Sequence, residues 1–397
     1  METKAETKTF IRKVEGFIVV RAIRNGLINI IPVLIIGAFA LILKTFPVEV
    51  YQNFIVDFAG GFLLNLFNIV YSATFGALSL YMTFSISRSY MRLKADANMH
   101  SAGAIIAALI SFFILAGSDL TTFGTNDMGP KSMFLAIITG LGASALYIVI
   151  GKFFRKRRHT LLSSGADIEF NVMLTELAPV AIVVLLFALF NVAVIRIFDA
   201  ESFRMLLIRF FSWVFSFGEV GFFKGFFFVL FSSVLWFFGI HGSDTLEEVM
   251  QQYFAPGLAV NQAAVAAGNA PTEVLTKEFF DCFVLMGGCG SAICLLIAIL
   301  IFSRNRARRG LGLTAAFPMI FNINELMVFG LPIIFNPVML IPFLAAPLVC
   351  YSVSYFAISV GIVPMITSEV AWTTPIILGG LRAYGCDFRG KVPGECV

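Results

Sequence analysis

The feature that most limits how this chain can fold is a series of long apolar stretches that contain no charged side chain. The stretches lie at 25–43, 58–87, 101–118, 132–151, 177–195, 225–240, 283–303 and 326–368. About 20 consecutive apolar residues are enough for a helix to cross the hydrocarbon core of a bilayer. Most of these stretches are close to that length, so they predict membrane-spanning helices, and the last is long enough for two crossings.

The overall composition points the same way. Apolar residues make up 59% of the chain and charged residues 13%, whereas a soluble domain carries about 25% charge. The net charge of +4 provides no general basic field for a polyanion, so we expect no nucleic-acid partner. We predict an all-α membrane protein, a polytopic bundle of about 9–10 transmembrane helices with re-entrant hairpins.

Basic residues at the ends of the apolar stretches predict the orientation of the chain. Lys and Arg cluster before the first stretch, after the second and fourth, and at 304–309. Such clusters stay on the cytoplasmic side of a membrane. We therefore expect a multi-pass protein of the bacterial inner (cell) membrane with a cytoplasmic N-terminus. The N-terminal residues do not show the pattern of a removable signal peptide.

A mixed polar and apolar segment divides the chain. It predicts an N-terminal transmembrane half at 1–158, an interfacial linker at 159–178 and a C-terminal transmembrane half at 179–381. The tail at 382–397 is too polar to span a membrane. The Phe-rich stretch 203–240 can form either one long bent helix or two shorter helices.

No cofactor motif is present in the sequence. The six cysteines form no Cys-x-x-Cys pair, which argues against a metal site or a disulfide framework. There is also no phosphate-binding Gly-x-x-x-x-Gly-Lys sequence. We therefore expect neither a metal nor a cofactor. The cysteines are Cys282, Cys289, Cys294, Cys350, Cys386 and Cys396.

One acidic residue lies alone in the last long apolar region. Glu325 is the only charged residue between Arg309 and Glu369, and a charge at mid-membrane costs at least about 2.5–3.5 kcal/mol. Asn322 and Asn324 precede it, and prolines and a glycine interrupt the helix pattern around it. Broken backbone at membrane depth needs protein or a wet cavity around it. We predict a re-entrant hairpin with Glu325 near its tip, or alternatively a structural Glu paired with a neighbouring helix.

Three other polar features are candidates for the same site. His241 ends an apolar run and is followed by Gly242, where the backbone can turn sharply. Trp372 precedes a proline break and offers a flat face to a sugar ring. Asn126 lies in a polar glycine loop at 124–130. The alternatives are a helix-capping His, a Trp at the membrane interface and an ordinary loop. Together, Asn, Glu, His and Trp favour a carbohydrate site, because amides and carboxylates bind hydroxyls.

Four segments resemble a known family. They are similar to the membrane IIC component of the lactose/cellobiose/N,N'-diacetylchitobiose class of the bacterial phosphotransferase system. The segments are WFFGIHG at 236–242, FPMIFNINELMVFGLP at 317–332, FNPVMLIPF at 335–343 and AWTTP at 371–375.

The resemblance implies an assembly and a site. It implies a homodimer with a dimerising N-terminal half and a sugar-binding C-terminal half. His241 and Glu325 would be the catalytic pair at a bound disaccharide, with Trp372 at the same site. We expect Asn322, Asn324, Gly242 and Asn126 to bind substrate as well.

The implied mechanism is group translocation, in which a cytoplasmic IIB subunit, supplied by IIA, phosphorylates the sugar as it enters. The chain alone would bind sugar without phosphorylating it. The tail 382–397 is shorter than the resemblance implies. Two other functions stay open: a sugar sensor that does not transport, and an ion-coupled symporter. The sequence does not select among cellobiose, diacetylchitobiose and lactose.

Overall fold

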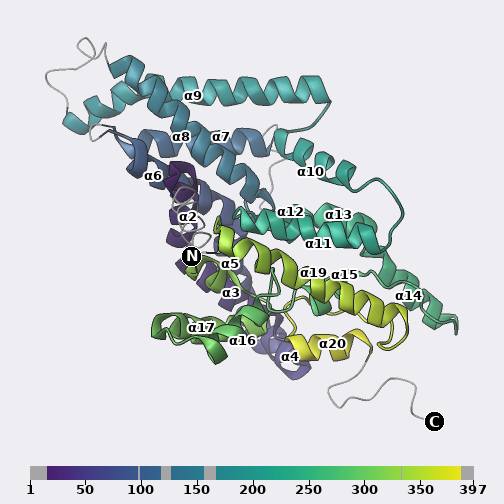
Figure 1. Ribbon diagram of the computed structural model, residues 1–397. Helices are drawn as coiled ribbons and strands as arrows, with labels where there is room; N and C mark the ends of the chain where they lie inside the picture. The colour runs from purple at the N-terminus through teal and green to yellow at the C-terminus, as the bar shows by residue number, and fades with distance from the viewer. Residues whose placement is uncertain (1–15, 97–98, 118–126, 156–166, 332, 386–397) are drawn as a thin grey trace, which may run out of the picture. The chain divides into compact units, whose positions relative to one another are not determined.

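A computed structural model describes residues 16–96, 99–117, 127–155, 167–331 and 333–385 of the 397-residue chain. Within these ranges every regular element is a helix (Figure 1). The predicted all-α fold is therefore confirmed. The helices pack into two compact units that alternate along the chain. One contains the described residues up to Pro32 and those in Phe75–Phe210, and the other contains Val33–Thr74 and the described residues from Phe211 onward.

The first unit is a bundle of long apolar helices. Its central helix α6 packs against α2, α7 and α8, and α9 covers α7 and α8. Ile86 of α6 lies against Gly26 and Gly140, where the absence of a side chain lets the helices approach closely. The helices are α2 (Ile18–Asn29), α6 (Leu78–Lys94), α7 (Ser101–Ala116), α8 (Met133–Arg155), α9 (Ile168–Phe198) and α10 (Phe203–Val214), the last of which continues into the second unit.

Buried hydroxyl groups join helices of this first unit. Ser85 donates a hydrogen bond to the carbonyl of Gly26 at 2.9 Å. The hydroxyls of Ser87 and Ser144 lie 2.8 Å apart. Small and hydroxyl-bearing residues are the usual means of joining helices where the surroundings are as apolar as the side chains.

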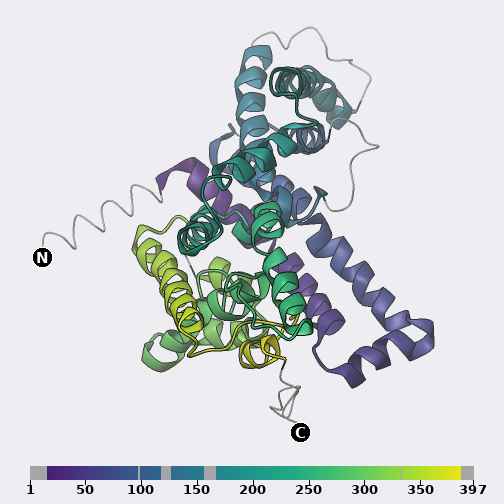
Figure 2. The same ribbon diagram turned by 90° about the vertical axis from the view of Figure 1, so that its right-hand side faces the viewer.

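The second unit is built from shorter and more broken helices. They are α3 (Ile31–Thr45), α4 (Glu49–Asp57), α5 (Phe62–Thr74), α11 (Phe222–Phe237), α12 (Gly242–Thr245), α13 (Glu247–Tyr253), α14 (Pro256–Ala266), α15 (Lys277–Phe279), α16 (Ala292–Phe302), α17 (Arg306–Ile320), α18 (Glu325–Gly330), α19 (Pro337–Ser359) and α20 (Ile376–Ala383). A π-helical turn, Phe280–Val284, continues α15. The long helix α19 packs along α11 (Figure 1, Figure 2).

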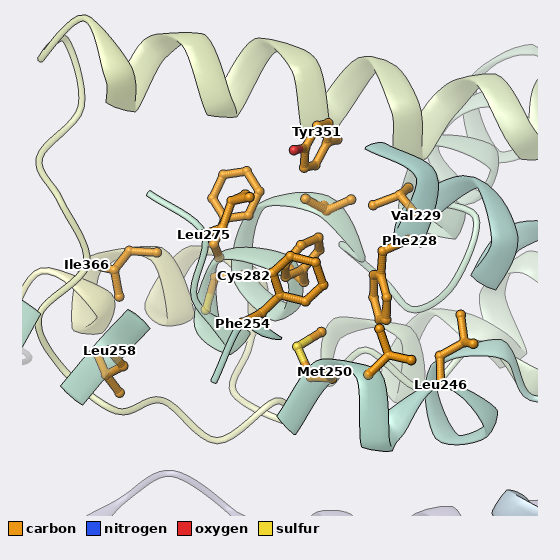
Figure 3. Packing of buried hydrophobic residues seen from close by; sticks show 14 of the residues in the cluster. Phe228, Val229, Leu246, Met250, Phe254, Leu258, Leu275, Cys282, Tyr351 and Ile366 are labelled. Atoms are coloured by element: carbon orange, nitrogen blue, oxygen red, sulfur yellow. The ribbon is translucent and has the colours of Figure 1, made fainter. Parts of the chain in front are cut away.

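Aromatic side chains form the core of this second unit. Tyr351 of α19 lies over Phe228 and Val229 of α11, with Phe254 and Met250 below (Figure 3). The Tyr351 hydroxyl donates to the backbone carbonyl of Phe222 at 2.7 Å, so the buried phenol has a hydrogen-bond acceptor. Aromatic residues dominate the burial because each removes a large apolar area from water.

Several helices are long and apolar enough to cross a membrane. Four such helices occur among the described residues, and the bent pair α2 and α3 makes a fifth if it counts as one span. Three shorter apolar helices are α7, α11 and α16. The four are Phe62–Lys94, Pro130–Phe154, Met173–Phe198 and Pro337–Ser359.

The structure corrects two of the predicted spans and decides one alternative. Stretch 283–303 is a π-turn, a glycine turn and the short helix α16, and stretch 326–368 contains one long helix, α19, instead of two. Stretch 203–240 forms two helices, α10 and α11, which settles that alternative. In each case hydropathy identifies apolar residues correctly but does not distinguish a helix from an apolar turn.

The predicted division into a dimerising half (1–158), a linker (159–178) and a sugar-binding half (179–381) stays a prediction. The packing units do not follow the same boundaries. Segment 33–74 belongs with the residues after Phe211, although it lies within the predicted N-terminal half.

Candidate functional site

Three interrupted segments of the second unit meet through two asparagine side chains. Asn322, in the turn between α17 and α18, accepts a hydrogen bond from the backbone N–H of Gly287 at 2.8 Å. Its amide nitrogen donates to the carbonyl of Trp372 at 2.7 Å. Asn324 donates to the carbonyl of Cys289 at 2.6 Å. These amides therefore join the glycine turn 285–291, the turn 321–324 and the segment 371–375.

The two turns need the residues that form them. Gly288 and Gly290 have φ angles of +90° and +76°, a region that only glycine enters freely. A Cβ on Gly288 would collide with Asn324, and one on Gly290 would collide with the Phe343 ring. Asn322 itself has φ +63°, which Asn tolerates better than most residues. The local sequence thus specifies where the helices break.

Glu325 is the first residue of α18 and directly follows the asparagine turn. This is the place in the hairpin that the sequence predicts for it. Its side chain is 7% exposed, and one carboxylate oxygen, Oε2, is buried without a hydrogen-bond partner among the described residues. His241 and Asp244 interact with it electrostatically. No Lys or Arg in the described part of the chain forms an ion pair with it, so the alternative of a structural ion pair gains no support.

His241 is held by a neighbour on its own helix. Its side chain caps the N-terminus of α12, and its Nδ1 lies 3.1 Å from Oδ2 of Asp244. The ring packs on Trp236 with 4.5 Å between ring centroids. His241 therefore does cap a helix, as the alternative predicts, but the cap uses only Nδ1. Nε2 is the ring nitrogen left for another partner.

Gly242 has a packing reason to be glycine. A Cβ at this position would overlap the backbone carbonyl of Ser232 in α11. The tight contact holds α12, and with it His241, against α11. Whether Gly242 also touches a substrate stays a prediction.

Trp372 contributes its backbone to the junction. Its carbonyl accepts the hydrogen bond from Asn322, while its side chain is 41% exposed. The neighbouring Thr373 hydroxyl lies 2.8 Å from that of Thr45 at the end of α3. The exposed indole is compatible with both alternatives that the sequence leaves open, a sugar-stacking ring and an interfacial ring.

Asn126, the remaining predicted site residue, lies outside the described residues. Its neighbour Asp127 is in the first unit and forms an ion pair with Arg204 at 2.6 Å.

Two residues that sequence reasoning missed lie near this charge cluster. Asp244 follows His241 by three residues and contacts it directly. Tyr71 of α5 interacts electrostatically with both Asp244 and Glu325, and the Lys44 ammonium lies 5.1 Å from its ring centroid. The spacing Asp244 to His241, three residues apart, was a usable signal. A Tyr in an apolar helix gave none.

A second ion pair lies beside these groups. Lys277 Nζ is 2.6 Å from Asp281 Oδ2. Burial alone lowers the pKa of Lys277, but the Asp281 carboxylate outweighs burial and the pKa is raised. Burial raises the pKa of Asp281, while the Lys277 ammonium lowers it.

Comparison with known proteins shows which family the chain resembles. The family model for the phosphotransferase system, EIIC, matches residues 24–347. The oligo-beta-mannoside-specific EIIC component of Bacillus subtilis (strain 168) is 28% identical over 384 residues, covering 93% of this chain and 84% of that protein. The cellobiose-specific EIIC component of Geobacillus stearothermophilus is 29% identical over 389 residues, covering 94% and 85%.

A solved structure is also similar. It is the transporter ChbC, the IIC component of the N,N'-diacetylchitobiose-specific phosphotransferase system, with 27% identity and a TM-score of 0.51. The match covers 96% of this chain and 90% of ChbC. The resemblance read from the sequence is therefore confirmed, and the chain belongs to the EIIC family of membrane components of the phosphotransferase system.

Proposed function

We propose that this protein binds a β-linked disaccharide and carries it across the membrane while a IIB subunit phosphorylates it. The observation that carries the proposal is the buried Glu325 carboxylate. Its Oε2 has no hydrogen-bond partner among the described residues, His241 and Asp244 act on the carboxylate electrostatically, and Glu325 directly follows the turn where the broken segments meet. A sugar hydroxyl can donate to that oxygen. The names of the relatives, which include cellobiose and oligo-beta-mannoside components, support the substrate class.

The chemistry follows from this geometry. Glu325 accepts the proton of the sugar hydroxyl while the hydroxyl oxygen attacks the phosphoryl group on the IIB cysteine. The new oxygen–phosphorus bond forms, the sulfur–phosphorus bond breaks and the thiolate leaves with the electron pair. His241, held at Nδ1 by Asp244, donates from its Nε2–H to the oxygen of the same hydroxyl. Phosphorylation traps the sugar and makes transport irreversible.

Other residues support this pair in our proposal. The side-chain amides of Asn322 and Asn324 are hydrogen-bonded to backbone groups. They therefore contribute to sugar binding by holding the turns in position. The Trp372 ring stacks on the apolar face of one sugar ring. Gly242 allows His241 to approach through its close contact with Ser232. Tyr71 supplies a further hydroxyl from α5.

The same proposal extends to assembly. The residues proposed to touch sugar are in the second packing unit, with the exception of Asn126, which is not described. We propose that the protein is a homodimer joined through its N-terminal half, that its N-terminus faces the cytoplasm of a bacterial cell, and that IIB, loaded by IIA, docks from that side.

Reconstitution separates the three candidate functions. Purified protein in vesicles, supplied with phosphorylated IIB on the cytoplasmic face, should convert external disaccharide into internal sugar phosphate. Unmodified sugar accumulating under a pH gradient would establish a symporter instead. Saturable binding with no uptake in either form would establish a sensor. A panel of cellobiose, diacetylchitobiose and lactose in a thermal-shift assay then identifies the substrate.

A further inference from the structure

Two carboxylates belong to the proposed sugar site, although the proposed chemistry needs only one proton acceptor. Glu325 is 7% exposed, and its Oε2 has no hydrogen-bond partner among the described residues. Asp244 lies in α12, and its side chain is 33% exposed. Asp244 acts electrostatically on Glu325, and both carboxylates act on Tyr71 of α5. Two negative charges in one partly buried place disfavour each other.

The protein uses only part of the Asp244 carboxylate. Its Oδ2 lies 3.1 Å from Nδ1 of His241. Its Oδ1 has no hydrogen bond or ion pair within the described part of the chain. An ionised carboxylate can accept at both oxygens, so Oδ1 is available to a donor that enters with the substrate.

No lysine or arginine among the described residues forms an ion pair with either acid. Lys277 is already in an ion pair with another carboxylate, and the Lys44 ammonium lies over an aromatic ring. The part of the chain that the structure describes also has no group of three or more side chains that could hold a metal ion. Because a carboxylate removed from water is costly without a partner, a cation carried by the substrate itself is favoured at this site.

We propose that the site prefers a β-linked disaccharide with a free amino group, of which the glucosamine dimer is the simplest example; this inference rests on the proposed function. The sugar ammonium donates to Oδ1 of Asp244, while Glu325 accepts from a sugar hydroxyl. An ammonium brings a positive charge and three donors. A hydroxyl at the same position has one donor and no charge, and an N-acetyl group is neutral and larger. The site therefore distinguishes the glucosamine dimer from cellobiose and from diacetylchitobiose.

Isothermal titration calorimetry of the full chain in detergent tests this preference. The glucosamine dimer, cellobiose and diacetylchitobiose are compared at about pH 6, where an amine similar to an α-amino group is protonated. We expect the glucosamine dimer to bind about tenfold more tightly than the other two, the effect of roughly one charge-assisted hydrogen bond. Asp244→Asn should lower the affinity for the glucosamine dimer about tenfold more than the affinity for cellobiose. Asp57→Asn removes an exposed carboxylate of the same packing unit and should change none of the three affinities.

The outcomes separate this inference from the proposed function. Cellobiose or diacetylchitobiose binding as tightly as the glucosamine dimer overturns the inference, and so does a preference that Asp244→Asn leaves unchanged. The comparison of the three sugars uses the unaltered protein, so it decides the question even if Asp244→Asn does not fold.

Phosphorylation of the bound sugars by phosphorylated IIB is measured in parallel. Phosphorylated cellobiose without any preference for the amine contradicts only the inference. A preference for the amine without phosphorylation of any of the three sugars supports the amine site and contradicts the proposed function.

Discussion

At the scale of single residues, the proposed chemistry depends on the buried Glu325 carboxylate and on the groups that interact with it electrostatically. Glu325 could be predicted as a candidate from the sequence because it is the one charge in the 59 residues 310–368, and such a charge is costly to bury. His241 could be predicted because glycines surround it. Asp244 was missed although its three-residue spacing from His241 is a usable signal, and Tyr71 could not be predicted because a phenol in an apolar helix is ordinary there.

Replacing Glu325 by Gln tests the proton acceptor. The amide keeps the size of the side chain and can still hydrogen-bond a hydroxyl, so sugar affinity should stay within roughly tenfold. Phosphorylation should disappear because the amide cannot accept the proton. Calorimetry measures the first quantity and sugar phosphate formation with phosphorylated IIB the second. Unchanged turnover would remove Glu325 from its catalytic role, and Glu201→Gln is the control.

Replacing Asp244 by Asn tests whether the carboxylate orients His241. The Nδ1 contact loses its charge, so turnover should fall by about ten- to a hundredfold while sugar affinity changes less. A double variant with His241→Ala should be no slower than His241→Ala alone, because residues that act together are not additive. Fully additive losses would show that Asp244 acts independently of His241.

At the scale of elements, the breaks between helices matter more than the helices. Prolines, glycines and asparagines predicted the turn before Glu325, because each of these residues disfavours a continuous helix. The glycine turn at 285–291 was missed because its neighbours are as apolar as those of a spanning helix. The pairing of that turn with Asn322 could not be predicted, since it joins residues 35 positions apart.

Variants at Asn322 test the junction of these breaks. Asn322→Ala removes the acceptor of the part-buried Gly287 N–H and the donor to the exposed Trp372 carbonyl, and should destabilise the fold by about 1–3 kcal/mol for the two hydrogen bonds. Asn322→Asp keeps the acceptor for Gly287 but loses the donor to Trp372. This variant should therefore also lower the stability, with the effect confined to the segment 371–375. Thermal unfolding in detergent measures both. Asn305 is an exposed residue whose side chain caps α17. Asn305→Ala therefore measures the effect of losing side-chain hydrogen bonds to the backbone away from this junction.

At the scale of the whole molecule, the chain order and the packing order differ. Segment 33–74 lies early in the sequence but packs with residues after Phe211. Thr45 contacts Thr373, and Arg382 donates to the carbonyl of Pro47 at 3.0 Å. Hydropathy places spans along a sequence but carries no information on which distant spans pack together. The packing of segment 33–74 with the residues after Phe211 could therefore not be predicted.

A cut chain tests the dependence of the second unit on this early segment. Fragment 159–397 expressed alone should be unstable, because its partners from 33–74 are missing. Co-expression with fragment 1–158 should restore a stable complex that binds disaccharide, whereas fragment 75–158, which can still pair with α9 through α7 and α8, should copurify without restoring binding. Fragment 159–397 that is stable and binds disaccharide by itself would contradict the expectation.

The hydrogen bond between Asn322 and Trp372 has a practical consequence. The Asn322 amide donates to the backbone carbonyl of Trp372, and the residue is 41% exposed. Any amino acid at position 372 offers the same carbonyl. If the ring stacks on sugar as proposed, exchanging the aromatic side chain at this position changes which saccharide is accepted while the hydrogen bond beneath it stays intact.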